Sequence, residues 1–319
     1  MMKLIRLICL ILMGCGAYSS AFADGVFPVV VKHALGSTVI EKSPKRIITI
    51  GWSGEDSVLA LGVTPIAMPR YTTFPSGIFP WNEGKLSATP TLLNFGMDYE
   101  AIAALKPDLI LGVYSGLNAI SYQRLSSIAP TIAYRSGPWR AGWREQTTII
   151  GEALGKQGEA EKLVKGADDY LVALGKSHLE LAGKTFTFGT FFPGSGNLVV
   201  YLPSDPRVAA LRLMGLELSS GVEALGKEYP DEFSTGVSLE NLDSIDADIL
   251  ILWFGETARA SLETQPLFQT LGSVQRGSYV ALEDPVEVWA TSALSVSSIP
   301  YGFQRFATRL ASAARITKD

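Results

Sequence analysis

The chain has 319 residues, 47% of them hydrophobic, and a formal net charge of −4 at pH 7. This length and apolar fraction suit two domains that each bury a sizeable core. The acidic balance, without a basic run long enough to follow a phosphate backbone, excludes nucleic acid as an expected partner.

The first residues have the pattern of a secretory signal peptide. Lys3 and Arg6 precede an apolar stretch over residues 7–17, and Ala21-Phe22-Ala23 fits the small-x-small rule for cleavage. We therefore expect a signal peptide over residues 1–23, cleavage after Ala23 and a periplasmic mature chain. No later stretch approaches the roughly 18 uninterrupted apolar residues of a membrane span.

A second interpretation of this segment stays open. Leu12-Met13-Gly14-Cys15 resembles a lipoprotein cleavage box, which would leave a lipid on Cys15. Cleavage after Ala23 would instead remove Cys9 and Cys15, the two cysteines of the chain. The mature protein would then have neither a disulfide nor a thiolate metal site.

Strands and helices alternate over residues 24–155, the expected N-terminal lobe. RIITIG from Arg46 predicts a buried strand, EDSVLALG after it a helix, and VTPIAM a second strand. A loop over residues 69–85 is rich in proline, glycine and aromatic residues. A short helix from Tyr99 and the apolar runs DLILGVY and TIAY follow. Strands that are apolar on both faces and alternate with helices predict a parallel sheet covered by helices.

Residues 156–182 have a helical pattern in place of the alternation of strands and helices. Apolar residues recur at spacings of three, four or seven from Gln157 to Leu181, which predicts one amphipathic helix about 40 Å long. Such a helix is long enough to bridge two lobes. The alternation of strands and helices resumes over residues 183–319, the expected C-terminal lobe. The fold class we expect is therefore α/β, with two parallel-sheet lobes joined by a single long helix.

One stretch of the sequence occurs twice. EAIAALKPDLIL from Glu100 and ENLDSIDADILIL from Glu240 align at a constant offset, with Asp108 paired to Asp248. An N-cap candidate precedes each glutamate by two residues. The simplest interpretation is that each glutamate lies in the first turn of a helix and favours the positive end of its dipole.

The chain resembles a known family in five stretches, which are RIITIGWSGEDSVLALGVTPIAM, MDYEAIAALKPDLIL, YQRLSSIAPTIAY, PLFQTLGSVQRGSYVAL and SALSVSSIPYGFQRF. This resemblance is to the periplasmic binding proteins of ABC importers for ferric siderophores and cobalamin. It implies a non-enzymatic, monomeric protein of two lobes joined by a rigid helix, with the ligand in the cleft between them. It also implies that one surface glutamate per lobe, matched here by Glu100 and Glu240, docks against arginines of a two-fold permease.

Ligands of parallel-sheet lobes bind outside the carboxyl ends of the strands. That rule selects aromatic and arginine residues as the ligand-binding set, namely Trp52, Arg70, Tyr71, Tyr114, Arg135, Arg140, Trp143, Tyr201, Phe233, Trp253 and Trp289, with Ser53, Trp139 and Arg144 beside them. Each has a simpler interpretation, because a tryptophan at a strand end is often a core residue and a loop arginine is often solvated.

Arginine donors over aromatic walls suit a bulky, flat-sided anion. We therefore expect a ferric siderophore with catecholate or carboxylate groups as the ligand, with the iron held by the siderophore and no covalent cofactor. Cobalamin would need less positive charge in its binding site. Haem would need a protein ligand for its iron, which Tyr71 or Tyr114 could supply. Both stay open as alternative ligands. The resemblance places an arginine before the helix at Tyr99 in ferric-hydroxamate binders, but Met97-Asp98 stand there in this chain, so that contact is not expected.

Other classes of protein fit less well. Gly51-Trp52-Ser53-Gly54 misses the spacing of a hydrolase G-x-S-x-G turn by one residue. His33 and His178 are the two histidines, and they lie too far apart in the sequence to suggest a free-metal site. A periplasmic sensor partner that uses the same two lobes is a further alternative.

Overall fold

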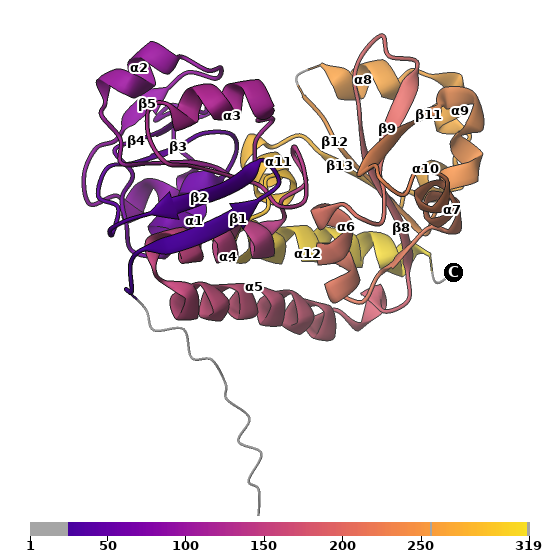
Figure 1. The fold of residues 1–319 in the computed structure, drawn as a ribbon. Coiled ribbons are helices and arrows are strands. Elements are labelled where there is room, and N and C mark those ends of the chain that lie inside the picture. The colour runs from indigo at the N-terminus through magenta and orange to yellow at the C-terminus, as the bar shows by residue number, and fades with distance from the viewer. Residues whose placement is uncertain (1–24, 256, 318–319) are drawn as a thin grey trace, which may run out of the picture.

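The computed structural model describes residues 25–255 and 257–317. The expected signal peptide over residues 1–23 and the alternative lipid site at Cys15 lie outside these residues. Two α/β lobes stand side by side, and helices α5 (Gln157–Ser177) and α12 (Ser298–Ile316) run beneath their junction (Figure 1). Within the described residues, no helix combines the length and the hydrophobicity needed to cross a membrane.

The first lobe is built on a five-stranded parallel sheet in the order β5-β4-β3-β6-β7. Its strands are β3 (Ile47–Thr49), β4 (Ala67–Pro69), β5 (Thr91–Leu93), β6 (Leu109–Gly112) and β7 (Thr131–Ala133). The helices that connect and cover them are α1 (Gly54–Ala60), η1 (Pro80–Lys85), α2 (Tyr99–Ala104), α3 (Ala119–Ser126) and α4 (Trp143–Leu154). An antiparallel hairpin of β1 (Val29–His33) and β2 (Gly36–Ile40) precedes the sheet.

The second lobe has a mixed sheet in the order β11-β9-β8-β12-β13, with β10 paired to β8. Its strands are β8 (Thr185–Phe191), β9 (Asn197–Tyr201), β10 (Glu217–Leu218), β11 (Ser234–Ser238), β12 (Ile249–Trp253) and β13 (Tyr279–Leu282). Its helices are η2 (Leu179–Leu181), α6 (Pro206–Leu213), α7 (Ser220–Glu228), η3 (Leu239–Ile245), α8 (Ala258–Glu263), α9 (Pro266–Gln269) and α10 (Gly272–Arg276), followed by α11 (Pro285–Ser292). Because β9 runs antiparallel to β8, the parallel-sheet rule does not apply to Tyr201, and the register places it beside the middle of β8 and not at the carboxyl end of a parallel strand.

The repeated stretch occupies equivalent places in the two sheets. In the first lobe β6 lies beside β3, and in the second β12 lies beside β8. Asp108, before β6, accepts hydrogen bonds from the backbone N–H groups of Lys45 and Arg46 ahead of β3. Asp248, before β12, accepts them from the backbone and hydroxyl of Thr185 at the start of β8. Each aspartate therefore fixes the entry of the neighbouring strand.

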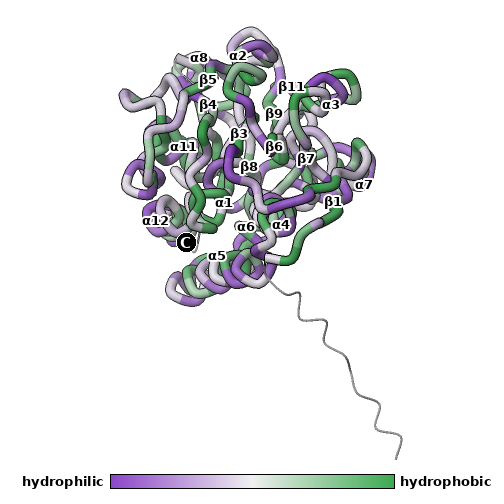
Figure 2. Tube along the Cα trace, turned by 60° about the vertical axis from the view of Figure 1, so that its left-hand side comes forward, coloured by the Kyte–Doolittle hydropathy of each residue, from purple (hydrophilic) through white to green (hydrophobic). Residues whose placement is uncertain are grey.

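The connecting helix α5 is shorter than the sequence predicted. It ends at Ser177, and a 3₁₀ turn continues to Leu181, so its 21 residues span about 31 Å. Alternating green and purple segments along α5 in Figure 2 show its amphipathic pattern. The carboxylate of Asp168 ties this helix to α4, because it accepts the indole N–H of Trp143 at 2.9 Å and the guanidinium of Arg144 at 2.8 Å.

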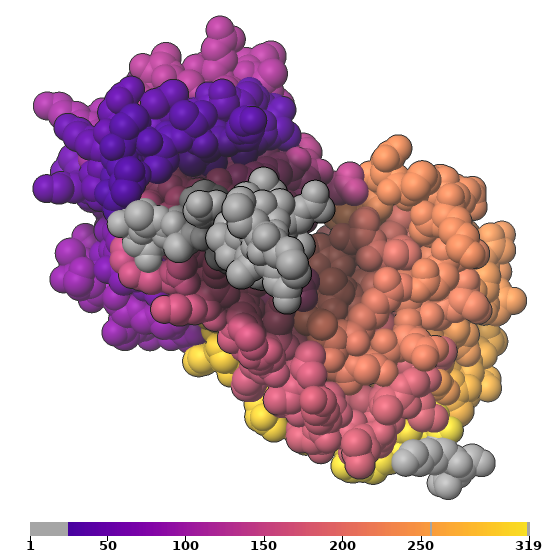
Figure 3. Space-filling model, turned by 60° about the horizontal axis from the view of Figure 1, so that its bottom comes forward, coloured from indigo at the N-terminus to yellow at the C-terminus, as the bar shows by residue number. Residues whose placement is uncertain are grey.

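The C-terminal segment crosses between the lobes a second time. After β13, helix α11 packs Ala290 and Trp289 against aromatic residues of the first lobe. Helix α12 then returns beneath the second lobe, where Arg309 pairs with Glu287 of α11 at 2.5 Å and donates to the Ala281 carbonyl of β13. In Figure 3 the rose surface of α5 continues from one lobe to the other, with the yellow surface of the C-terminal segment beside it.

Two adjacent carboxyl groups are buried at the start of α1, beneath the junction of α11 and α12. Asp56 accepts hydrogen bonds from the indole N–H of Trp81 at 2.8 Å, from the amide of Asn82 and from the hydroxyl of Ser295. Glu55 is equally buried, and neither of its carboxyl oxygens has a hydrogen bond of normal geometry from the described residues. Burial, and next the charge of Asp56, raise the pKa of Glu55 to about 8, and burial raises the pKa of Asp56 to about 6. At neutral pH the structure therefore favours a protonated Glu55 beside an ionised Asp56.

We predict that Glu55→Gln flattens the pH dependence of stability. The raised pKa of Glu55 means that its contribution is fully present below the ordinary value of 4.5 and is lost as the pH rises through about 8. Glutamine keeps the shape and cannot ionise, so the variant should exceed the wild type in Tm by about 5 °C at pH 8 and by less than about 1 °C at pH 4.5. Thermal unfolding followed by circular dichroism over this range measures the difference.

The matched control is Asp56→Asn, which disturbs three hydrogen bonds and should lower Tm at every pH. Parallel pH profiles for the wild type and Glu55→Gln would contradict the assignment of a protonated Glu55.

Candidate ligand-binding site

An aromatic side chain follows each of the five strands of the first sheet. These residues are Trp52 after β3, Tyr71 after β4, Phe95 after β5, Tyr114 after β6 and Trp139 after β7. Because parallel strands end at one edge of their sheet, all five rings lie along that edge. Trp52, Tyr71 and Tyr114, with Trp139 beside them, were predicted from the sequence for this reason, whereas Phe95 was not.

The rings contact one another and the indole of α11. Trp52 lies at the centre, with ring centroids 5.1 Å from Trp139, 5.1 Å from Trp289 and 6.2 Å from Tyr114. Tyr71 lies 5.4 Å from Trp289 and 5.8 Å from Phe95. Most of these contacts are edge-to-face, the arrangement that aromatic pairs favour. We call the six residues Trp52, Tyr71, Phe95, Tyr114, Trp139 and Trp289 the aromatic floor.

The turn from β3 into α1 positions the centre of the floor. The Trp52 N–H donates to the Tyr114 carbonyl at 2.8 Å, and the Ser53 N–H donates to the Tyr71 hydroxyl at 3.0 Å. Gly51 adopts a φ of 89°, and a Cβ there would lie 2.2 Å from the Tyr114 carbonyl oxygen. Glycine is therefore required for the two strand ends to approach this closely.

Aromatic residues of the second lobe continue the floor. The Trp253 indole donates to the Tyr201 hydroxyl at 2.7 Å, and Phe192 packs edge-on against Trp253 at 6.0 Å. The Arg207 guanidinium lies over the Tyr201 ring at 4.1 Å and pairs with Asp205 at 2.8 Å. Arg207 also interacts with Tyr114, so this buried ion pair joins the two lobes at the floor.

Arg207 and Phe192 were not predicted as site residues. Asp205-Pro206-Arg207 reads as a helix start, and the Asp205 carboxylate does cap α6 by accepting the Arg207 N–H. No local signal distinguishes this arginine from a solvated one. Phe192 follows β8, so the same strand-end rule that selected Trp253 could have found it.

Burial separates the tryptophans and phenylalanines from the tyrosines. Tyr71, Tyr114 and Tyr201 are at most 4% exposed, whereas Phe95 is 53% and Phe192 50% exposed. The four tryptophans at positions 52, 139, 253 and 289 are partly exposed. The tyrosines therefore support the surface from behind, and the indole and phenyl rings form its accessible part.

The buried tyrosines are poor candidates for iron ligands. Burial raises the pKa of Tyr71 and of Tyr114, and it raises that of Tyr201 to about 12, which opposes the phenolate that binds ferric haem. His33 is bonded to Thr38 at 3.1 Å in the β1–β2 hairpin, and His178 follows α5. Among the described residues no group of three or more His, Cys, Asp or Glu side chains could hold a metal ion.

The structure does not gather the predicted arginines on the floor. Arg135 pairs with Glu152 at 2.6 Å and donates to the Lys32 carbonyl of β1. Arg144 pairs with Asp168 of α5. Arg140 crosses to the second lobe, where it donates to the Asp231 carbonyl at 2.8 Å.

Arg70 differs from the other three arginines. It is exposed, and its side chain has no hydrogen-bond or ion-pair partner among the described residues; its methylene groups pass over Gly77. Of the four predicted arginines, two are therefore paired with acids, and Arg140 and Arg70 have no acidic partner among the described residues.

Of two further predicted aromatic contacts, Trp143 belongs to the core, whereas Phe233 stays a prediction. Trp143 is 1% exposed and packs in the core of the second lobe while donating to Asp168, so it is a core residue between α4 and α5. Phe233 is partly exposed in the loop before β11, and only its carbonyl is engaged, by the Leu202 N–H. Ser53 donates to Gln146 at 3.1 Å and has no histidine partner, so it lacks the base of a hydrolase nucleophile.

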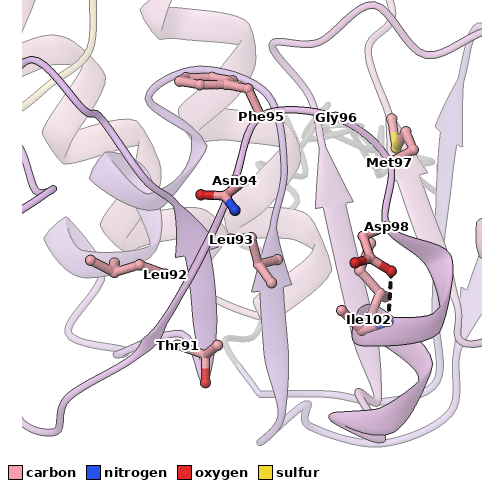
Figure 4. Close-up of a pocket in the computed structure, with 10 residues that line it drawn as sticks. Thr91, Leu92, Leu93, Asn94, Phe95, Gly96, Met97, Asp98 and Ile102 are labelled. Atoms are coloured by element: carbon pink, nitrogen blue, oxygen red, sulfur yellow. Dashed lines mark hydrogen bonds between the residues drawn. The ribbon is translucent and has the colours of Figure 1, made fainter.

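A groove of about 530 Å³ borders the outer end of the floor. It lies between β5 and α2 and is lined mainly by Leu92, Leu93, Phe95, Met97 and Ile102 (Figure 4). Met97-Asp98 replace the arginine that the resemblance placed before this helix, and the Asp98 carboxylate caps α2 by accepting the Ala101 N–H at 2.9 Å.

Comparisons with known proteins agree with this architecture. The chain is 27% identical over 277 residues to the probable siderophore-binding lipoprotein YfiY of Bacillus subtilis, with 82% of each chain covered. It is 27% identical over 280 residues to the Fe(3+) dicitrate-binding periplasmic protein FecB of Escherichia coli, covering 82% of this chain and 86% of that one. The structure of Streptococcus pneumoniae PiaA in complex with ferrichrome aligns with a TM-score of 0.82 at 29% identity, over 90% of this chain and 99% of that one.

The family model described as "Periplasmic binding protein" matches residues 47–285, which include both sheets and most of the aromatic floor. The chain therefore belongs to the periplasmic binding protein family.

Proposed function

We propose that this protein captures a ferric siderophore outside the cytoplasmic membrane and delivers it to the permease of an ABC importer. The observation that carries the proposal is the aromatic floor, which Trp253 and Phe192 continue into the second lobe and which offers partly exposed indole rings to a bulky ligand. Relatives named for siderophore and ferric dicitrate binding, and the ferrichrome complex of PiaA, support it.

Iron would arrive already chelated. The buried, protonated tyrosines and the two distant histidines leave haem without a protein ligand on its iron, which makes haem the weaker alternative. Cobalamin needs no such ligand and is best separated from siderophores by binding assays. The exposed rings supply apolar contact area, and a flat ligand can stack on them.

Delivery would use the two repeated glutamates. Glu100 lies on α2 and Glu240 at the start of η3; both are exposed, and their carboxylates have no ion-pair partner among the described residues. Each follows the N-cap that the sequence predicted, Asp98 and Ser238 respectively. Exposed ion pairs contribute only about 0–1 kcal/mol each, so the two glutamates would orient a transient complex more than hold it together.

The first prediction concerns the centre of the floor. Trp52→Leu should weaken siderophore binding by about tenfold or more, because the indole contacts three other rings and presents part of its surface to the ligand. Quenching of the remaining tryptophan fluorescence by a panel of ferric siderophores, haem and cobalamin measures the affinities.

Tyr301→Ala is the matched control, since this aromatic residue of α12 is 51% exposed and contacts Trp81 outside the floor. It should leave the affinity unchanged. If no ferric siderophore quenches the wild-type fluorescence below millimolar concentration, the proposed function is wrong.

The second prediction concerns docking. Glu100→Arg combined with Glu240→Arg should leave ligand affinity intact and abolish uptake, because it places positive charge against the arginines expected on the permease. Uptake of the radiolabelled iron complex by cells that carry the cognate permease measures the effect.

Glu161→Arg combined with Glu217→Arg makes the same charge change at exposed positions on α5 and β10, and it should transport normally. Normal uptake by the Glu100/Glu240 double variant would refute the docking role.

A further inference from the structure

We infer that the aromatic floor selects a ferric complex without net charge, of the trihydroxamate class, over anionic ferric tris-catecholates and ferric citrate. The inference rests on the proposed function and narrows its ligand. It reverses the expectation of an anionic ligand, which depended on four arginines at one sheet edge.

Acidic side chains compensate two of the four positive charges. Glu152 pairs with Arg135, and Asp168 pairs with Arg144. Arg140 donates to the backbone carbonyl of Asp231, which directs its guanidinium to the second lobe without neutralising it. Arg70 alone among the four has no partner in the described part of the chain, and it is exposed to solvent, where salt screens its charge.

The charged groups buried around the floor also compensate one another. Arg207 is 6% exposed and its partner Asp205 is fully buried, so this pair adds no net charge. Asp56 lies beneath Trp289 with Lys85 near it, and Lys85 donates to Ser297 at 2.9 Å. A multiply charged anion on this surface would lose water and meet only Arg70 and Arg140 as arginines without an acidic partner, which leaves part of its charge uncompensated at a cost in free energy.

The floor nevertheless offers neutral donors. Among the described residues the indole N–H groups of Trp52, Trp139 and Trp289 have no hydrogen-bond acceptor, and all three side chains are partly exposed. Neutral N–H donors suit the carbonyl oxygens and the nitrogen-bound oxygens of hydroxamates, and the surrounding rings suit the apolar spacers between them. Phe95 and Phe192, each about half exposed, form the two ends of this surface.

The net charge of the iron complex differs between the classes of siderophore. Three singly charged hydroxamates cancel the charge of Fe³⁺, and the complex is neutral. Three doubly charged catecholates leave an excess of three negative charges, and ferric citrate is also anionic at neutral pH. The surface described above can desolvate the first kind of complex at low cost and the other two only at high cost.

Fluorescence titrations with ferrichrome, a ferric tris-catecholate of similar size and ferric citrate test the inference, each at about 50 and 500 mM salt. Ferrichrome should bind at least about tenfold more tightly than either anion, and its Kd should change by less than about twofold with salt because no net charge is paired. Phe95→Ala and Phe192→Ala should each weaken ferrichrome binding by about fivefold, with Tyr301→Ala as the control.

Arg70→Gln separates the two classes of ligand. A neutral ligand should lose less than about threefold in affinity, whereas an anion that uses this guanidinium should lose about tenfold. Tighter binding of the catecholate or citrate complex, or an affinity that falls steeply with salt, would overturn the inference while leaving the proposed function in place. If none of the three complexes binds, the proposed function itself is wrong.

Discussion

The carboxylate of Asp56 is the interaction on which the rest of the site depends. It is fully buried and accepts hydrogen bonds from three residues in two separate segments, Trp81 and Asn82 of η1 and Ser295 of the α11–α12 turn. Breaking a buried charge from its donors typically costs several kcal/mol, so these segments are held together in the native state. The hydrogen bond from Ser295 to Asp56 keeps α11 packed on the first lobe. It thereby holds the indole of Trp289 against that of Trp52. The arrangement of the aromatic floor therefore depends on the buried hydrogen bonds of Asp56 as well as on the contacts between its own rings.

Two crossings between the lobes restrict how they can move. Helix α5 is tied to α4 through Asp168, and the C-terminal segment is tied to both lobes through Asp56 at one end and Arg309 at the other. A single flexible hinge would allow wide opening, whereas two structured crossings favour small displacements. A surface that is formed before the ligand arrives loses less conformational entropy on binding. The buried pair of Arg207 and Asp205, in contact with Tyr114, adds a further link at the floor itself.

The internal repeat separates structural from functional residues. Its aspartates, Asp108 and Asp248, accept hydrogen bonds from the start of the neighbouring strand in each lobe, which explains their presence without reference to any partner. Its glutamates, Glu100 and Glu240, are exposed and unpaired in the described structure. A glutamate in the first helical turn gains from the helix dipole, but that gain does not require an equivalent residue in both lobes. Docking of the two glutamates to a two-fold permease, as proposed above, would account for their symmetry.

The sequence by itself determined the class of fold and the position of the aromatic residues, because both follow from local patterns. Buried strands that alternate with helices require a parallel sheet, and such strands bring Trp52, Tyr71 and Tyr114 to one edge. The tertiary structure alone decided which charges are available. Arg135 and Arg144 find acids that are distant in the sequence, Arg207 is buried beside Asp205, and Trp143 enters the core of the second lobe. Which charges form ion pairs depends on which segments lie side by side in the folded chain. The periodicity of the sequence does not predict these tertiary contacts.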